Sequence, residues 1–298
     1  MARIRYDRLP TERSNPRSRA LDRLSPVAIA RLMNRADREA VKAVGGAAPA
    51  IGRAVTAIVA RLGRGGRLIF VGAGTSGRLG VIEAAECPPT FNTRPGQVQA
   101  VMAGGRRAVF RSVEGAEDDT RAGARAVRGR ADRRDAVVGI AASGVTPFVR
   151  AALDEARRRG AFTVLVTCNP SAPRAAARVI IALRVGPEVL AGSTRLKAGT
   201  ATKLTLNTLT TAAFTRLGKV HGNRMVDLQP KSAKLRARAR RLVRDLGHVS
   251  AARAAKLLDQ AGGSAKVAVV MARRRITAAE ARRRLSAAGG FLGPAAGM

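Results

Sequence analysis

The sequence predicts an α/β protein in which a parallel sheet is covered by helices on both faces. Short apolar segments of strand length recur along the chain, and stretches with helical periodicity separate them. A loop rich in glycine and hydroxyl residues directly follows the first apolar segment. Apolar strands that alternate with helices are typical of parallel sheets buried on both sides, where ligands bind beyond the carboxyl ends of the strands.

The first 45 residues are predicted to form an N-terminal helical arm. This segment carries Thr11-Glu12 ahead of Pro16 and then apolar residues at helical spacing. A second helix is predicted from Ile51, because apolar residues recur at i, i+4, i+7, i+8 and i+11 before Gly63. This helix leads into the first strand.

The main domain is expected to cover residues 46–230. Within it, a helix is predicted over residues 147–159, and a buried helix is predicted in the Thr- and Leu-rich stretch before Gly218. Residues 231–298 are rich in alanine and arginine with glycine breaks, which predicts a small C-terminal helical module. After the first strand, further strands are predicted at residues 97–103, 136–141, 162–167 and 178–183.

The charge of the chain raises the question of a nucleic-acid partner. Its 298 residues include 55 Lys and Arg against 20 Asp and Glu, which gives a net charge of +35 at pH 7. The basic residues are spread along the whole chain, in a composition that a GC-rich coding sequence also produces. Because there is no tryptophan, one tyrosine and no helix-turn-helix or zinc-finger spacing, we expect no specific nucleic-acid binding.

The cysteines, histidines and apolar segments argue against several other classes. Cys87 and Cys168 lie far apart without metal-ligand spacing, and the only histidines are His221 and His248. No stretch approaches 18 uninterrupted apolar residues, and the first residues lack the apolar core of a signal peptide. We therefore expect a soluble, cytoplasmic protein without membrane contact, metal, cofactor or disulfide framework.

The glycine-rich loop predicts a site for an anionic ligand. Three glycines between Gly72 and Gly77 fit the G-x-G-x-x-G pattern of dinucleotide sites. The next predicted strand, however, runs into Gly104-Gly105-Arg106-Arg107 and offers no acidic residue for the ribose of NAD. Thr75 and Ser76 favour a phosphosugar instead, since hydroxyls and amides together hold a compact phosphomonoester. A dinucleotide site and a turn without a ligand stay as alternatives.

Two clusters of carboxylates follow this loop in a chain that is poor in acidic residues. Glu83 and Glu86 are three positions apart, so they share a face of a helix that begins near Thr75. Pro88-Pro89 is predicted to end that helix at Glu86-Cys87, which leaves Glu86 where a side chain can reach a cleft. The second cluster lies at residues 114–119. Solvated surface charge is the alternative interpretation for each of them.

A series of motifs occurs in order along nearly the whole chain. They are residues 66–119, Ala141-Ala142-Ser143-Gly144 with Thr146-Pro147, Cys168-Asn169-Pro170, residues 192–200 and residues 218–227. Together they resemble the N-acetylmuramic acid 6-phosphate etherases, lyases of the sugar isomerase (SIS) fold that are related to glucokinase regulatory protein. The resemblance implies a SIS-type three-layer α-β-α sandwich with a parallel sheet.

The resemblance also implies a reaction and two acid/base residues. The family splits the D-lactyl ether of N-acetylmuramic acid 6-phosphate and gives N-acetylglucosamine 6-phosphate and D-lactate. In the open-chain sugar the C2 proton is α to an aldehyde, so a carboxylate can remove it while a second acid protonates the C3 ether oxygen. The family's pair corresponds to Glu117, assigned to the C2 proton, and Glu86, assigned to the ether oxygen and the incoming water.

The same resemblance predicts the residues around the substrate. One departure is Val145, where the family commonly has arginine, and loss of that cation is expected to weaken phosphate binding. The phosphate and the rest of the cleft are expected to involve Gly74, Thr75, Ser76, Gly77, Ser143, Gly144, Thr146, Ser193, Thr194 and Lys197.

Two other functions and the oligomeric state stay open in the sequence. A SIS-fold isomerase also begins with proton removal beside a sugar carbonyl, and a noncatalytic phosphosugar sensor could share the fold. Retention of Glu86 and Glu117 argues for catalysis. The resemblance implies a homodimer, in which the arm with Thr11 and Glu12 either reaches a neighbour's cleft or packs as an ordinary terminus.

Overall fold

The computed structural model describes residues 9–173, 176–228, 230 and 232–298. The chain forms two compact units, one of residues 1–84 and 96–210 and the other of residues 85–95 and 211–298. The start of the predicted arm, residues 1–8, lies outside the described residues. The predicted domain boundaries after residues 45 and 230 stay predictions.

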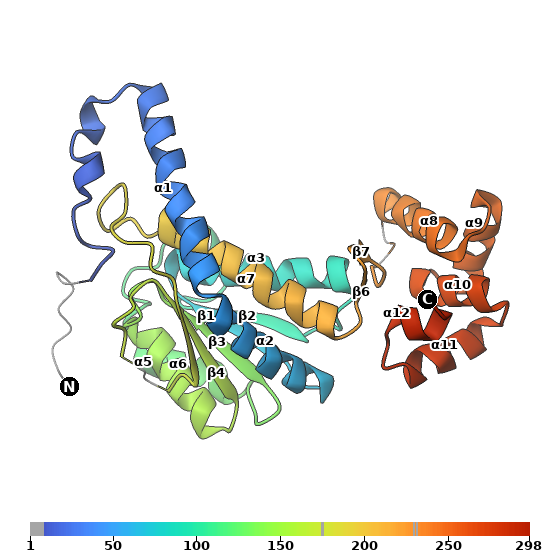
Figure 1. Ribbon diagram of the computed structural model, residues 1–298. Helices are drawn as coiled ribbons and strands as arrows, with labels where there is room; N and C mark the ends of the chain where they lie inside the picture. Colours follow the sequence, from blue (N-terminus) through green and yellow to red (C-terminus); the bar gives the residue numbers. More distant parts are fainter. Residues whose placement is uncertain (1–8, 174–175, 229, 231) are drawn as a thin grey trace. The chain divides into compact units, whose positions relative to one another are not determined.

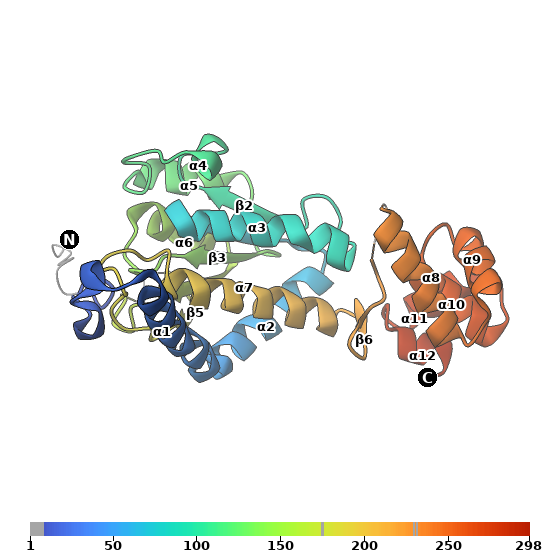
Figure 2. The ribbon, with the colours of Figure 1, turned by 90° about the horizontal axis from the view of Figure 1, so that it is seen from above.

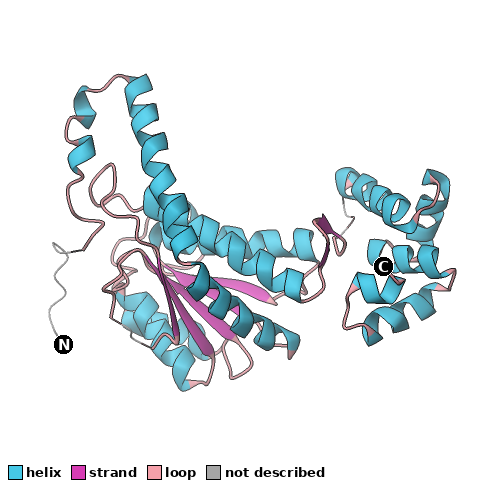
Figure 3. Ribbon diagram, in the orientation of Figure 1, coloured by secondary structure: helices cyan, strands magenta, loops and turns pink. Residues whose placement is uncertain are grey.

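The first unit contains a five-stranded sheet with the order β2-β1-β3-β4-β5. Its strands are drawn in magenta in Figure 3. Every neighbouring pair is parallel, so the predicted parallel α/β fold is confirmed. Gly72 at the end of β1 is in register with Met102 of β2 and with Ile140 of β3, which aligns the carboxyl ends of these strands. The strands are β1 (Leu68–Gly72), β2 (Val98–Met102), β3 (Ala136–Ile140), β4 (Phe162–Thr167) and β5 (Val179–Ala182).

Helices cover both faces of this sheet (Figures 1 and 2). Successive side chains of a strand point to opposite faces. Ile69 and Val71 of β1 therefore share one apolar core with helices α5 and α6. Phe70 points to the other face, where the Cα of Gly80 in α3 is so close that an added Cβ would lie 3.0 Å from the Cβ of Phe70. The helices of this unit are α1 (Pro26–Gly46), α2 (Ala48–Gly63), α3 (Gly74–Phe91), α4 (Arg107–Phe110), α5 (Thr120–Arg128), α6 (Pro147–Arg158) and α7 (Lys197–Arg216), of which α3 and α7 continue into the second unit.

The amphipathic pattern before the first strand forms α2 as predicted. Its apolar stripe, from Ile51 through Ile58 to Leu62, is buried, and the helix contacts β3, β4 and β5. Among the described residues no single helix has the length and apolar character to cross a membrane, while the pair α1 and α2, bent by 57°, passes that test jointly.

The prediction that Pro88-Pro89 ends the helix at Glu86-Cys87 is wrong, because α3 continues to Phe91. Proline fits the helical φ angle but removes hydrogen bonds and crowds the carbonyl four residues earlier. Packing at the helix end offsets this cost: the buried ring of Phe91 stacks on Phe214 with centroids 4.8 Å apart. The helix then ends at Asn92, whose φ of 52° is left-handed and whose amide donates to the carbonyl of Pro88.

The described C-terminal residues fold into a helical module (Figure 1), whose apolar core also includes Val226 and Leu228. Side-chain oxygens of Ser232, Ser250, Ser264 and Thr277 accept the amides that begin its first four helices. The sequence did not predict the short hairpin of β6 (Val220–His221) and β7 (Arg224–Met225) that precedes it. The helices are α8 (Ala233–Gly247), α9 (Ala251–Gln260), α10 (Ala265–Arg274), α11 (Ala278–Ala287) and α12 (Leu292–Ala296).

Candidate active site

A cleft of about 300 Å³ lies beyond the carboxyl ends of β1 and β3 in the first unit. The strand order reverses between these two strands, and in open α/β sheets this is where ligands bind. The lining comes from the loops after β1 and β3, the loop before α5, the arm and the loop before α7. It consists of Leu9, Thr11, Glu12, Ala73, Gly74, Thr75, Ser76, Glu117, Asp118, Ile140, Ala141, Ala142, Ser143, Val145, Thr146, Pro147, Gly192 and Thr194.

The loop from β1 to α3 presents hydroxyls and helix amides to this cleft. Gly72 and Gly77 lie so close that a Cβ on Gly72 would be 2.6 Å from the amide nitrogen of Gly77. This contact brings the start of α3 directly against the strand end, where Gly74 takes a left-handed φ of 54°. The first turn of a helix carries unpaired amides and the positive end of the helix dipole, so Thr75 and Ser76 stand where an anion is favoured.

The loop from β3 to α6 forms a second wall of the same cleft. Gly144 has a φ of 73°, and a Cβ there would lie 2.4 Å from the Cβ of Ala172, so glycine is required. The side chain of Asn169 donates a 3.0 Å hydrogen bond to the carbonyl of Ser143 and fixes the turn. Thr146 is the N-cap residue of α6, but its side chain makes no capping bond, which leaves its hydroxyl available to a ligand.

Glu117 is held beside this second loop by the backbone. The amide of Phe148, in the first turn of α6, donates a 2.9 Å hydrogen bond to the carbonyl oxygen of Glu117. Gly123 allows α5 to approach α6, because a Cβ on it would be 2.2 Å from the carbonyl oxygen of Phe148. The side chain of Glu117 is exposed and lines the cleft, where a carboxylate can exchange protons with a ligand.

Seven of the twelve predicted site residues therefore line this cleft. Gly77 and Gly144 are not among the lining residues, and they act through the close backbone approaches described above. Ser193 is also outside the lining, between Gly192 and Thr194, which do line it. The seven are Gly74, Thr75, Ser76, Glu117, Ser143, Thr146 and Thr194.

Lys197 is buried at the start of α7 and is not among the lining residues. Its ammonium donates to the carboxylate of Glu39 at 2.8 Å and to the carbonyl of Val185 at 2.6 Å. The buried carboxylate of Glu188 accepts the amides of Lys197 and Ala198, at 3.0 and 2.9 Å, and so caps α7. Burial raises the pKa of Glu188, and these two amides act against that rise. Lys197 thus links the start of α7 to α1 and to the loop before α7.

The two glutamates of α3 have different surroundings. Glu83 is buried, and its carboxylate accepts hydrogen bonds from Lys203 at 2.7 Å and Thr210 at 2.5 Å. These contacts join α3 to α7, and the two helices lie side by side in Figures 1 and 2. Glu86 belongs to the second unit, is exposed and is not among the residues that line the cleft.

The cleft is acidic within a strongly basic chain. Glu12, Glu117 and Asp118 contribute carboxylates, whereas no lysine or arginine occurs among the described residues that line it. Hydroxyls and amides are the donors that remain for a phosphate. The sequence interpretation left Leu9, Thr11, Glu12 and Asp118 out of the predicted site. The Thr11-Glu12 pair in the arm was the available signal, but sequence alone did not say which cleft it would reach.

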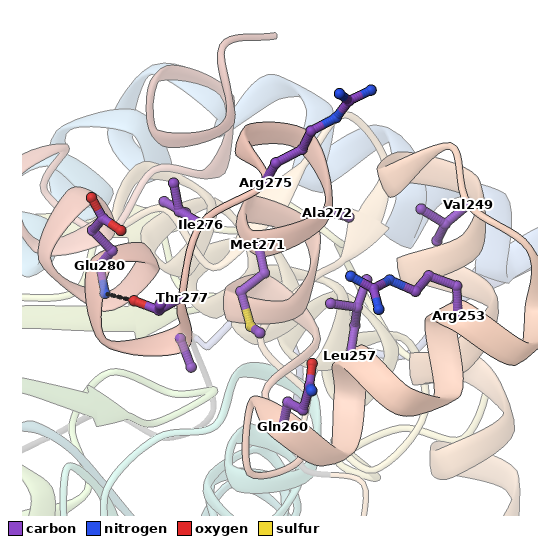
Figure 4. Close-up of a pocket in the computed structure, with 11 residues that line it drawn as sticks. Val249, Arg253, Leu257, Gln260, Met271, Ala272, Arg275, Ile276, Thr277 and Glu280 are labelled. Atoms are coloured by element: carbon purple, nitrogen blue, oxygen red, sulfur yellow. Dashed lines mark hydrogen bonds between the residues drawn. The ribbon is translucent and has the colours of Figure 1, made fainter.

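A larger cavity of about 730 Å³ lies in the C-terminal module (Figure 4). Much of its lining is aliphatic, including Leu257, Met271 and Ile276. The hydroxyl of Thr277 is already engaged, since it accepts the amide of Glu280 at the start of α11. This cavity lacks the two hydroxyl-bearing loops of the cleft, so the cleft is the better candidate for a phosphate site. In the described parts of the chain, no group of three His, Cys, Asp or Glu residues could hold a metal ion.

Comparisons with known proteins show which sequences this chain resembles. The model of the glucokinase regulatory protein N-terminal SIS domain matches residues 50–157. An N-acetylmuramic acid 6-phosphate etherase of Jannaschia sp. (strain CCS1) is 52% identical over 263 residues, which cover 88% of this chain and 83% of that protein. The etherase of Gloeobacter violaceus is 52% identical over 287 residues, which cover 95% of this chain and 94% of that protein.

A solved structure of a phosphoheptose isomerase from Francisella tularensis superposes with a TM-score of 0.45 and 17% identity, over 66% of this chain and 98% of that one. The sequence relatives alone are similar enough, and over enough of the chain, to decide its family. The chain belongs to the N-acetylmuramic acid 6-phosphate etherase family.

Proposed function

We propose that the cleft between the β1 and β3 loops binds N-acetylmuramic acid 6-phosphate and that Glu117 and Glu86 catalyse loss of its lactyl group. The chain is a carbon–oxygen lyase that converts this ether to N-acetylglucosamine 6-phosphate and D-lactate. The observation that carries the proposal is the meeting of two hydroxyl-bearing loops and the Glu117 carboxylate in one cleft at the sheet switch point.

Phosphate recognition is assigned to neutral donors. Thr75 and Ser76 at the start of α3, with Ser143 and Thr146 before α6, offer hydroxyls at two helix N-termini. Hydrogen bonds from such groups to a charged phosphate are stronger than neutral ones. Ser193, Thr194 and Lys197 are also assigned to this side of the site: Thr194 lines the cleft, Ser193 precedes it in the chain, and the buried Lys197 bonds to Glu39 and Val185.

The reaction balances with two carboxyl groups and one water. In the open-chain sugar, the Glu117 carboxylate takes the C2 proton, the C3–oxygen bond breaks, and Glu86 gives a proton to the departing lactate oxygen. The ionised Glu86 then removes a proton from water, whose oxygen adds to C3, and Glu117 returns its proton to C2. The support for Glu86 is its motif, Glu86-Cys87-Pro88-Pro89, in a chain about half identical to named etherases. Acid/base groups of this kind contribute about 10²–10⁴-fold each.

The proposal includes a homodimer that works in the cytoplasm. The homodimer is supported by membership of a family whose SIS-type sheets commonly pair. The cytoplasmic location is supported by the substrate, which is a phosphorylated sugar. The arm residues Leu9, Thr11 and Glu12 line the cleft of their own chain. In the proposed homodimer, the cleft of one subunit therefore does not need the arm of the other subunit.

The decisive experiment measures D-lactate release from N-acetylmuramic acid 6-phosphate by the purified chain. The unphosphorylated sugar is the control substrate, since its turnover must be far lower if the phosphate loops bind as proposed. Reaction in heavy-oxygen water should place the label at C3 of N-acetylglucosamine 6-phosphate, because the bond between C3 and the ether oxygen breaks and the oxygen of water replaces that of the lactate. No lactate, or lactate release without label at C3 of the N-acetylglucosamine 6-phosphate, would refute the proposed reaction.

A further inference from the structure

The N-terminal arm forms part of the wall of its own chain's cleft. The carbonyl of Thr11 accepts a 3.0 Å hydrogen bond from the amide of Gly192, which lines the cleft. Four residues on, the side chain of Asn15 donates a 3.3 Å hydrogen bond to the carbonyl of Pro187. The arm is thus fastened at two points to the loop that precedes α7.

A network of ion pairs connects the arm to α1 and to the start of α7. Arg17 of the arm forms an ion pair with Glu39 of α1, and Glu39 in turn binds the buried Lys197 at 2.8 Å. The hydrogen bond from Lys197 is the main cause that holds the pKa of Glu39 below its ordinary value. Arm, α1 and the start of α7 are connected by these contacts, so the arm has a defined position.

Glu12 is the polar group that this arrangement brings to the cleft. One carboxylate oxygen accepts a 3.2 Å hydrogen bond from the hydroxyl of Thr11. The other lies against Gly192, where an added Cβ would be only 2.9 Å away. Gly192 also has a φ of 78°, so a side chain at this position is disfavoured for two reasons. The glycine leaves room for the carboxylate at the edge of the cleft.

A carboxylate restricts which part of a substrate can lie beside it. An ionised carboxylate only accepts hydrogen bonds, so it pairs with hydroxyl or amide N–H groups and repels a phosphate or a second carboxylate. The phosphate has its own donors at Ser76 and Ser143 in the same cleft. The hydroxyl-bearing part of a sugar phosphate is the part that fits beside Glu12.

We infer that Glu12 is a substrate-binding residue that accepts hydrogen bonds from sugar hydroxyl or amide groups and so sets the direction in which the sugar phosphate lies in the cleft. This inference rests on the proposed function for the identity of the sugar. The arm then serves as a specificity element for polyhydroxylated phosphate esters, in the chain to which it belongs.

The test compares two ligands on three variants by calorimetry. The ligands are N-acetylglucosamine 6-phosphate and inorganic phosphate, and the variants are Glu12→Gln, Glu12→Ala and, as a matched control, Asp22→Asn, another exposed carboxylate of the arm. The sugar phosphate should bind about 10-fold more weakly to Glu12→Gln and still more weakly to Glu12→Ala, since a charge-assisted hydrogen bond is lost. Inorganic phosphate has no hydroxyl-bearing carbon chain, so its affinity should stay the same or rise.

The pattern across ligands separates the possible outcomes. Equal losses for both ligands would mean that Glu12 only maintains the loop, and unchanged sugar-phosphate affinity would mean that it makes no contact, so either result overturns the inference. Neither measurement depends on turnover. A wild-type chain that binds the sugar phosphate but releases no lactate would remove the proposed reaction and leave the role of Glu12 to be decided by these affinities.

Discussion

The backbone amide of Phe148 donates a 2.9 Å hydrogen bond to the carbonyl oxygen of Glu117. This single bond joins the acidic segment before α5 to the first turn of α6. Thr146, at the N-cap of the same helix, supplies a hydroxyl to the cleft that Glu117 lines. One helix N-terminus therefore positions both a proposed phosphate-binding hydroxyl and the proposed base.

Glu117→Gln and Glu86→Gln should each lower turnover by about 10²–10⁴-fold, the usual scale for an acid/base group. Both side chains are exposed, so the folded structure should persist. Steady-state lactate release measures the loss. Exchange of the C2 proton with deuterated solvent separates the roles, since Glu86→Gln should still exchange this proton while Glu117→Gln should not.

Asp154→Asn is a suitable control for these two variants, because Asp154 is an exposed carboxylate on α6 and is not among the residues that line the cleft. Its turnover should match that of the unchanged chain. Near-normal lactate release by both glutamate variants would contradict the two-glutamate mechanism, and reversed exchange behaviour would interchange their roles.

Ser76→Ala and Ser143→Ala should each weaken binding of the phosphorylated sugar by about 1.5–3 kcal/mol, the range for hydrogen bonds to charged groups. Competition by inorganic phosphate measures the phosphate contribution directly. Val145→Arg should tighten binding, because Val145 lines a cleft that has no basic residue in its described lining. If phosphorylated and unphosphorylated sugars turn over equally well, these loops do not hold the phosphate.

Asp227→Asn should destabilise the C-terminal unit by about 3–5 kcal/mol, since it removes the partner of a buried cation. The carboxylate of Asp227 lies 3.2 Å from the ammonium of the buried Lys266 and 2.7 Å from that of Lys219. Burial alone would raise the pKa of Asp227, but these lysines hold it below its ordinary value of 3.8. Urea unfolding is the measurement, and the exposed Asp259→Asn is the control in the same unit.

The pH dependence of this effect has a definite sign. Because the pKa of Asp227 is lower in the folded chain than in the unfolded chain, its stabilising contribution is present above about pH 4. It is lost as the pH falls through the folded-state pKa. The difference between the unchanged chain and Asp227→Asn should therefore shrink in acid, and a difference that is constant from pH 7 to pH 3 would contradict this account.

Local patterns were sufficient to predict much of this fold. The buried strands are near-continuous apolar runs, and the stripe from Ile51 to Leu62 marks α2 unambiguously. The error at Pro88-Pro89 has a physical reason: the stacking of Phe91 on Phe214 joins residues far apart in sequence, and no local rule contains it. The burial of Lys197 beside Glu39 is a long-range pairing of the same kind.

The site was predictable where chemistry and loop position coincide. Thr75, Ser76 and Ser143 follow strand ends, and parallel strands bring such loops together. Glu12 lies far from these loops in sequence, and long-range contacts of the arm, among them the hydrogen bonds of Thr11 with Gly192 and of Asn15 with Pro187, bring it to the cleft. An acidic residue in a terminal arm has no periodicity or strand end to mark its destination.

The last prediction concerns the proposed homodimer and its dependence on salt. With a net charge of +35, two copies repel each other strongly at low ionic strength. At about 0.15 M salt the screening length falls to about 8 Å, so contacts between apolar surfaces can then outweigh the repulsion. Sedimentation velocity should show more dimer in about 0.15 M salt than in about 0.02 M salt.

Interference optics suit the measurement, because the chain has one tyrosine and no tryptophan. Samples need nuclease treatment, since so basic a chain binds nucleic acid nonspecifically at low salt, and such complexes would sediment faster for another reason. A nuclease-treated chain that stays monomeric and fully active at both salt concentrations would refute the dimer, while the cleft with its own arm would still account for that activity.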